Sequence, residues 1–157
     1  MRVPIVRLEM VVDGYAESLR EPLFSSGKAA EWIGRNIIRH SNREHIIVVG
    51  CDASGRATYI DEIGRGSVNY CPGTIPEIFK AAIMSNATKI LIFHNHPSGA
   101  PTPSRMDKEF TKKVRKAGEM LDIELADHII IGKDGTYYSF MEDNKTGGSP
   151  DIAGNSI

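Results

Sequence analysis

The sequence predicts an α/β domain in which a central mixed β-sheet is packed by about three helices. Short apolar runs rich in β-branched residues, the pattern of buried strands, stand at residues 45–51, 88–94 and 123–132. Apolar residues at helical spacing mark three further segments, at 27–40, 76–86 and 104–121. With 157 residues, 41% of them hydrophobic, the chain can bury one compact core.

The first half of the chain is expected to give a strand, a helix and a hairpin. Residues 3–12 are apolar and β-branched and predict a strand. Ser26 is the expected cap of the helix at 27–40. Turn-forming residues at 52–55 follow the strand at 45–51, so we expect a hairpin over 45–63.

The second half is expected to alternate helices and strands. The helix at 104–121 should end near Asp122, and a KDG turn after the strand at 123–132 should lead into a short strand at 136–140. Residues from 141 onward are small and polar. We therefore expect one domain over residues 1–140 and a poorly ordered tail over 141–157.

Charge and hydropathy exclude several classes of protein. With 19 basic and 20 acidic side chains the formal charge is −1, so no overall field draws the chain to nucleic acid or to a membrane. The longest apolar runs, such as 46–49 and 90–93, fall far short of the roughly 20 residues that a membrane span needs, and no leader opens the chain. We expect a cytoplasmic protein in which Cys51 and Cys71 are free thiols.

Two histidines follow the strand at 88–94 at a spacing that suits a metal. Side chains alternate along a strand, so His94 and His96 point the same way while Asn95 points away. A proline-rich turn then returns the chain to a helix start at Ser104, which can bring Asp107 back toward both imidazoles. Two histidines and one carboxylate suit Zn²⁺ with a fourth position left for water, as in catalytic sites.

Helix capping is the alternative explanation of Ser104 and Asp107, because S-x-x-D is a variant of the capping box. Steps of about 100° per residue, however, place Asp107 on the same side of the helix as Phe110 and Val114, which are expected to be buried. A carboxylate that faces inward needs a partner, and the two histidines could supply one through a metal. The helical pattern thus favours a metal site.

The stretch HNHPSGAPTPSRMD, residues 94–107, resembles the metal motif of the JAB/MPN (JAMM) metalloprotease family, and most closely its RadC-like branch. The similarity continues through GSVN at 66–69, PEIFKAAIMSNA at 76–87 and DHIIIG at 127–132, and spans about residues 22–140. The resemblance implies a JAB/MPN fold, which is similar to that of cytidine deaminases. One departure is the loop around Cys71, where the RadC-like pattern usually has serines and a His-Pro-Arg-Glu stretch.

The resemblance also implies a chemistry, a zinc-dependent metallopeptidase or isopeptidase that cleaves an amide bond of an unidentified protein or peptide. His94, His96 and Asp107 would bind one Zn²⁺ per chain, and the Ser104 hydroxyl would support the oxyanion. Glu44 would be the general acid/base that takes a proton from water and returns it to the leaving amine, with Glu62 as the second candidate.

Other features are expected to have structural roles or to indicate a different function. His128 could support a metal ligand, but we interpret it as a strand histidine with a structural role. A basic stripe on the helix at 104–121 is expected to be a solvated face. The alternative function is a non-catalytic or nucleic-acid-associated accessory module in DNA repair, although the helix-hairpin-helix region that many RadC proteins carry ahead of this domain is expected to be missing.

Overall fold

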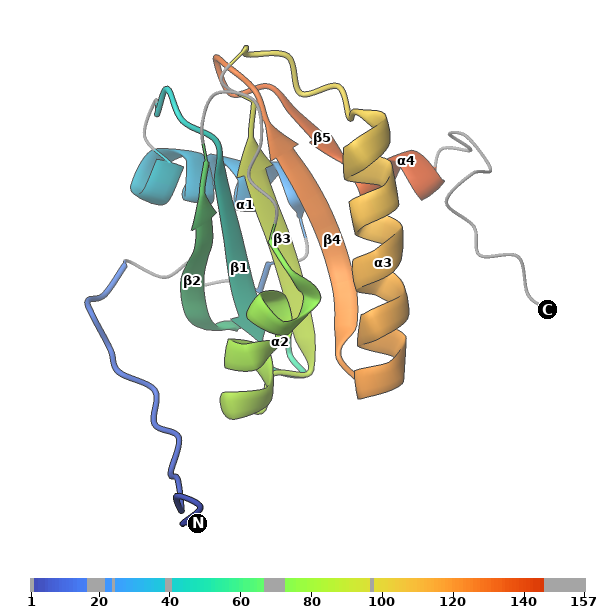
Figure 1. The fold of residues 1–157 in the computed structure, drawn as a ribbon. Coiled ribbons are helices and arrows are strands. Elements are labelled where there is room, and N and C mark those ends of the chain that lie inside the picture. The colour runs from blue at the N-terminus through green and yellow to red at the C-terminus, as the bar shows by residue number, and fades with distance from the viewer. Residues whose placement is uncertain are drawn as a thin grey trace, which may run out of the picture.

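The computed structural model describes residues 2–16, 22–23, 25–38, 41–66, 73–96 and 98–145. Its centre is a five-stranded sheet with the strand order β2, β1, β3, β4, β5 (Figure 1). Strands β3 and β4 are parallel, and the other neighbouring strands are antiparallel. The predicted α/β class with a mixed sheet is confirmed.

The strands fall close to the predicted positions. Their bounds are His45–Cys51 for β1, Ala57–Arg65 for β2, Lys89–Asn95 for β3, Glu124–Ile131 for β4 and Tyr137–Ser139 for β5. The expected hairpin joins β1 to β2 through a turn in which Gly55 has a φ of 79°. A glycine suits this position because left-handed backbone costs it little.

The helices cover both faces of the sheet. Their bounds are Ser26–Ile33 for α1, Gly34–Ile38 for the π-helical turn η1, Ile75–Met84 for α2, Arg105–Leu121 for α3 and Phe140–Lys145 for α4. In Figure 1, α2 and α3 lie on one face of the sheet and α1 on the other. As predicted, α3 ends near Asp122: its last residue is Leu121, and Asp122 takes the left-handed conformation of a C-cap.

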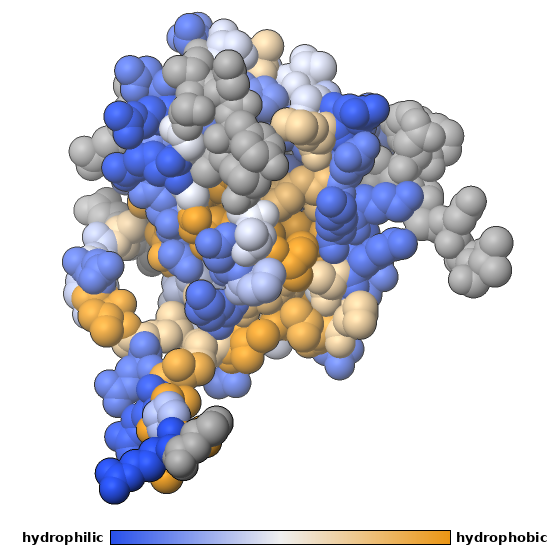
Figure 2. Space-filling view, viewed as in Figure 1, coloured by the Kyte–Doolittle hydropathy of each residue, from blue (hydrophilic) through white to orange (hydrophobic). Residues whose placement is uncertain are grey.

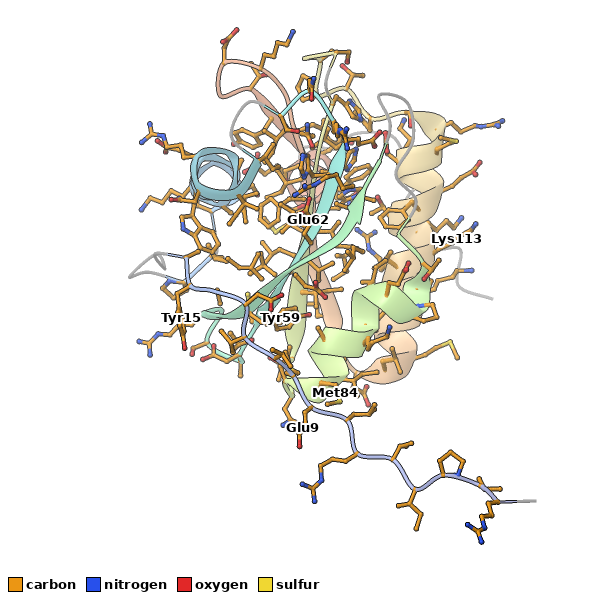
Figure 3. The ribbon with its side chains drawn as sticks, turned by 60° about the vertical axis from the view of Figure 1, so that its left-hand side comes forward. Glu9, Tyr15, Tyr59, Glu62, Met84 and Lys113 are labelled. Carbon is orange, nitrogen blue, oxygen red and sulfur yellow. The ribbon has the colours of Figure 1, made fainter. Side chains whose placement is uncertain are left out.

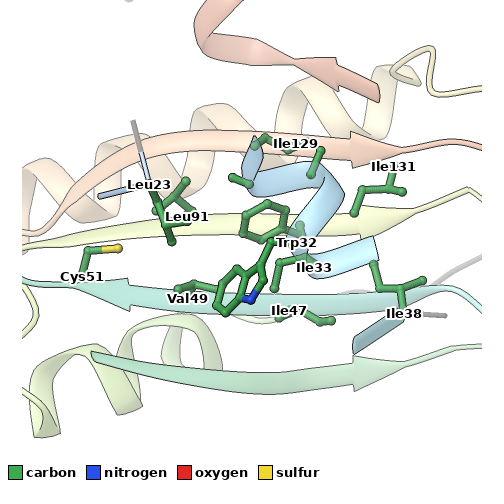
Figure 4. Close-up of a cluster of buried hydrophobic side chains, with 13 residues drawn as sticks. Leu23, Trp32, Ile33, Ile38, Ile47, Val49, Cys51, Leu91, Ile129 and Ile131 are labelled. Carbon is green, nitrogen blue, oxygen red and sulfur yellow. The ribbon is translucent and has the colours of Figure 1, made fainter. Parts of the chain in front are cut away.

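Strand alternation divides the core into two apolar layers. Odd-numbered residues of β1 and β3, such as Ile47 and Phe93, pack with Trp32 of α1 (Figure 4). Even-numbered residues, such as Val48 and Ile92, pack beneath α2 and α3. Each fully buried side chain of this size contributes about 1.5–3 kcal/mol relative to leaving it in water. The layer under α2 and α3 continues along β3 to His94, which therefore faces the same side.

A register shift in β4 decides which of its polar residues face α3. Ile90 pairs with Leu125, but Leu91 pairs with Asp127, so Ala126 is an extra residue in β4. Leu125 packs in the layer under α2 and α3, and strict alternation would send residue 127 to that side. Because of the shift, Asp127 faces α1, where it accepts a hydrogen bond from Ser26, and His128 faces α3.

Two sequence-based predictions in the N-terminal part are wrong. Residues 3–12 form no strand, and Figure 3 shows Glu9 and Tyr15 along an extended trace that leaves the domain. Their apolar pattern gives β-propensity, but a strand also needs an edge to pair with, and no pairing of this segment occurs among the described residues. The cap of α1 is Ser25, whose side chain accepts from the Lys28 N–H, and not Ser26.

The C-terminal boundary also differs from the prediction. Residues expected to begin a disordered tail form α4 instead, because Met141 N–H donates to Asp127 and Glu142 N–H donates to Ser139. Residues 146–157 lie outside the described part of the chain, as do residues 39–40 at the end of the predicted first helix.

Hydrophilic side chains gather on the outer side of α3 in the space-filling view (Figure 2). Among the described helices, none is long and apolar enough to span a membrane.

Candidate metal centre

Three polar side chains converge where β3 ends and α3 begins. His94 Nε2 lies 3.0 Å from His96 Nε2. One carboxylate oxygen of Asp107, Oδ1, lies 3.3 Å from His94 Nε2, and the other, Oδ2, lies 3.6 Å from His96 Nε2. His94 is buried, while His96 and Asp107 are partly exposed. The predicted trio is thus brought together as a group that could hold a metal ion, with a side open to solvent.

Asp107 caps α3 and still has an oxygen available for a metal, so the two roles that the sequence left as alternatives are compatible. Its Oδ2 accepts a hydrogen bond from the Ser104 N–H at 2.6 Å, and the Ser104 hydroxyl accepts one from the Asp107 N–H at 3.2 Å. This is a complete capping box, which fixes the first turn of α3. The second oxygen, Oδ1, points to His94. Capping and metal binding are therefore compatible, since each uses a different oxygen.

When both rings are neutral and carry their proton on Nδ1, the candidate ligand atoms are hydrogen-bond acceptors without a donor between them. His96 Nδ1 lies 2.8 Å from the Ala100 carbonyl, which can only accept, so this nitrogen carries the proton. In a neutral ring, Nε2 of His96 then has only its lone pair to direct at Asp107, which is also an acceptor. A proton or a metal cation must enter to satisfy them. Tetrahedral zinc, with Zn–N of about 2.05 Å, would separate its ligand atoms by about 3.3 Å. The two Nε2 atoms lie 3.0 Å apart, and His94 Nε2 lies 3.3 Å from Asp107 Oδ1.

The electrostatics of the trio favour bound positive charge. Burial alone would raise the pKa of Asp107, but the hydrogen bonds that His94 and His96 donate when they are protonated, with the one from Ser104, hold this pKa well below its usual range. The hydrogen bond to Asp107 raises the pKa of His96 although burial opposes the shift. Asp107 is therefore ionised at neutral pH and supplies the negative charge that a divalent cation requires.

Glu44 stands next to the trio at the start of β1. Partial burial raises the pKa of its carboxyl group, electrostatic interaction with the imidazoles of His94 and His96 lowers it, and the charge of Asp107 raises it, with a net upward shift. Asn95 holds the backbone on both sides of this residue: its side-chain oxygen accepts from His45 N–H at 2.8 Å, and its amide donates to the Arg43 carbonyl at 2.9 Å. The residue between the two histidines thus fixes the segment that carries Glu44.

Glu62, the second candidate for the general base, is engaged elsewhere on β2 (Figure 3). Arg65 donates to both of its carboxylate oxygens, at 3.0 and 2.8 Å, and His45 Nδ1 contacts it as well. Burial would raise the pKa of Glu62, but these bonds lower it overall. The structure places Glu44, and not Glu62, beside the three candidate metal ligands, His94, His96 and Asp107.

His128 touches the metal trio, which the sequence did not indicate clearly. Its Nε2 lies 2.8 Å from His94 Nδ1, and its Nδ1 lies 2.7 Å from the Thr111 hydroxyl. The ring is fully buried and stacks on Phe140, with centroids 5.0 Å apart and planes 7° from parallel. Burial lowers the pKa of His128 well below its usual value. The expectation of a purely structural strand histidine is therefore incomplete, because the ring contacts a candidate ligand directly.

Comparison with known proteins identifies the fold that carries this site. The model of the RadC-like JAB domain family matches residues 24–146, which is more than three quarters of the chain. The chain belongs to the RadC-like JAB domain family. The match extends past residue 140 and includes α4, in agreement with the hydrogen bond from the Met141 N–H to Asp127 of β4.

Individual relatives show the same family. The chain is 42% identical over 103 residues to a UPF0758 protein of Chloroflexus aurantiacus, covering 66% of this chain and 44% of that protein. It is 40% identical over 105 residues to a UPF0758 protein of Trichlorobacter lovleyi, covering 67% and 45%. A third, from Chloroflexus aggregans, is 39% identical over 123 residues, covering 78% and 53%. This RadC-like JAB domain thus spans about half the length of the curated relatives it matches.

The RadC-like JAB domain gathers five of the predicted site residues at one end of the sheet and leaves Glu62 apart from them: the five are Glu44, His94, His96, Ser104 and Asp107. Sequence reasoning missed Thr111 and the role of Asn95, since both act through contacts with segments 17 or more residues away. Cys71 and its loop lie outside the described residues. The departure at that loop stays a sequence observation.

Proposed function

We propose that this chain is a zinc-dependent hydrolase of amide bonds, of the metallopeptidase or isopeptidase type. The observation that carries the proposal is the meeting of two imidazole nitrogens and the two oxygens of one carboxylate group, at distances of 3.0 to 3.6 Å, with Glu44 beside them. Three protein ligands of these types, with room for water, are typical of catalytic zinc and not of structural zinc, which four protein groups enclose. When bound, Zn²⁺ supplies Lewis acidity that acidifies water and polarises a carbonyl.

Glu44 is suited to move the proton. Burial moves the pKa of its carboxyl group upward, in the direction of neutral pH. A general acid/base works best when its pKa lies near the working pH. It would accept a proton from the attacking water and return it to the amine that leaves. The two hydrogen bonds that Asn95 makes to the neighbouring backbone keep this carboxylate in place between the two steps.

Ser104 is suited to stabilise negative charge on the substrate. Its oxygen accepts the Asp107 N–H, so its own proton is available to donate to a developing oxyanion at the start of α3. A donor already held in position needs no rearrangement during the reaction, which is the basis of oxyanion stabilisation.

The alternative, a non-catalytic or nucleic-acid-associated accessory module in DNA repair, has less support. The basic face of α3 is interrupted by acidic side chains, and Arg105 lies 3.7 Å from Glu109. A binding module has no need of a base, an oxyanion donor and three ligands in one place. The family relationship and the site together support the hydrolase.

The proposal is tested with Glu44→Gln and its matched control Glu62→Gln, each incubated with a cytosolic proteome beside the wild type. Newly exposed amino termini and lysine side chains are then compared. We expect wild type and Glu62→Gln to give the same new ends, and Glu44→Gln to keep its metal but lose about 10²- to 10⁴-fold in rate. Identical profiles for wild type and Glu44→Gln would contradict the proposal.

A further inference from the structure

We propose that Thr111 and His128 are positioning residues that fix the tautomer of His94, so that its Nε2 presents a lone pair to the metal. This inference rests on the metal site of the proposed function, but its first test does not need metal. It follows from counting protons along a chain of three short hydrogen bonds that begins at the backbone of α3.

The first proton is assigned by a backbone carbonyl. The Thr111 hydroxyl lies 2.7 Å from the carbonyl oxygen of Asp107, which can only accept, so the hydroxyl donates its single proton there. Toward His128 Nδ1, also 2.7 Å away, the same oxygen can then only accept. His128 therefore carries a proton on Nδ1.

The second proton is assigned by the burial of His128. Its ring is 1% exposed, stacks on Phe140 and meets Phe110 edge-on, with centroids 5.7 Å apart. Neither ring nitrogen has a carboxylate partner among the hydrogen bonds of the described residues. A charge in such surroundings is costly, so the ring is neutral and its Nε2 is an acceptor. His94 Nδ1, 2.8 Å away, must then donate.

The consequence is a ligand prepared in the correct tautomer. A neutral His94 with its proton on Nδ1 has only a lone pair on Nε2, the atom 3.3 Å from Asp107 Oδ1. Free histidine prefers the opposite tautomer, with the proton on Nε2, which would occupy the metal position. The chain of bonds starts at the carbonyl of Asp107 and ends at His94, whose Nε2 lies 3.3 Å from the carboxylate of the same aspartate, so it links two candidate ligands. Partners of this kind commonly contribute 10- to 100-fold to metal affinity.

The first test is a long-range ¹H–¹⁵N spectrum of the imidazole groups in the metal-free full chain at neutral pH. We expect His94 and His128 both to carry the proton on Nδ1. In Thr111→Val the acceptor of His128 is lost while the shape is kept, and we expect both rings to change to the Nε2 tautomer. Thr111→Ser keeps the hydroxyl and should give the wild-type spectrum. A wild-type spectrum with the proton on Nε2 of His94 would overturn the inference.

The second test measures zinc affinity by competition with a chromophoric chelator. Thr111→Val should bind zinc about 10- to 100-fold more weakly than wild type, and Thr111→Ser should match it. A second pair of variants tests the same role if Thr111→Val does not fold. His128→Gln keeps an oxygen acceptor toward His94 and His128→Leu does not, although both variants lose the stacking on Phe140. Equal affinities within each pair would overturn the positioning role. If the wild type does not bind zinc, both the proposed function and this inference are overturned. If the wild type binds zinc tightly but His94 has its proton on Nε2 in the metal-free chain, only this inference is overturned.

Discussion

Asp127 and His128 are neighbours in β4, yet they face opposite sides of the sheet and anchor polar networks that end differently. On the side of α1, Asp127 accepts hydrogen bonds from the Ser26 hydroxyl, the Ser139 hydroxyl and the Met141 N–H. On the side of α3, His128 links Thr111 to His94. The first network ties three elements to β4, and the second leads to the ligand trio.

The difference shows how one strand serves both folding and function. Around Asp127 each donor meets an acceptor, so the network is complete without any added group, and its buried polar atoms are satisfied. Around His94 the bonds end at a lone pair beside other acceptors, so this network becomes complete only when a positive charge enters. A polar cluster whose acceptors lack a donor is therefore the better candidate for a ligand site.

The largest effect is expected from Asp127→Ala, which leaves three donors without an acceptor. Each unsatisfied buried donor costs about 1–3 kcal/mol, so the free energy of unfolding should fall by about 3 kcal/mol or more, measured by urea denaturation. Zinc affinity of the folded fraction should not change. A loss of zinc affinity without a loss of stability would show that the two networks are not separate.

Ser104→Ala tests the oxyanion role on the α3 side. We expect a loss of about 100-fold in kcat with the metal retained, because the hydroxyl donor is removed, and a loss of about 1 kcal/mol in stability from the missing cap. Ser104→Thr keeps both the hydroxyl and the capping group and serves as the control. An unchanged kcat in Ser104→Ala, measured on a substrate found by the proteome comparison, would assign this serine to capping alone.

The network on the α3 side should also respond to pH. The hydrogen bond to Asp107 raises the pKa of His96, so a proton competes with the metal up to a higher pH than at an ordinary histidine. Asp107 stays ionised because its pKa is lowered. Zinc affinity should therefore be full above the His96 pKa and fall below it by about tenfold per pH unit. Chelator competition across this range measures the effect, and an affinity independent of pH would contradict it.

Asn95→Ala should give the smallest of these effects, through Glu44. Removing the side chain frees the His45 N–H and the Arg43 carbonyl, so the backbone that carries Glu44 loses its two fixed points. We expect kcat to fall about tenfold while zinc affinity stays at the wild-type value. The comparison variant is Asn95→Gln, which keeps both polar groups on a longer side chain. A parallel loss of zinc would mean that Asn95 supports the ligands themselves.

Local sequence patterns were sufficient for the parts of the site that depend on short spacings. Alternation placed His94 and His96 on one side, and helical periodicity turned Asp107 inward. Glu44 needed the family resemblance, because a glutamate before a strand carries no signal of its own. The contact of His128 with Thr111 depends on the extra residue at Ala126, and a register shift of this kind leaves no mark in the hydrophobic pattern.

The fold was predictable to a similar degree. Strands β1 and β3 were found because helices cover both of their faces, and burial on both faces requires continuous apolar runs. Residues 3–12 have the same composition but no pairing partner among the described strands. Helix α4 was missed because its polar residues are held by bonds to Asp127 and Ser139 and not by an apolar stripe.

The central claim is that His94, His96 and Asp107 bind one divalent cation, and metal content tests it most directly. Wild type and Asp107→Ala are purified alike, exposed to zinc, exchanged against a weak chelator and analysed for bound metal, with circular dichroism to confirm that both are folded. We predict about one zinc ion per wild-type chain and almost none in the variant. A folded wild-type chain that takes up no zinc, or a variant that takes up as much, would contradict the account.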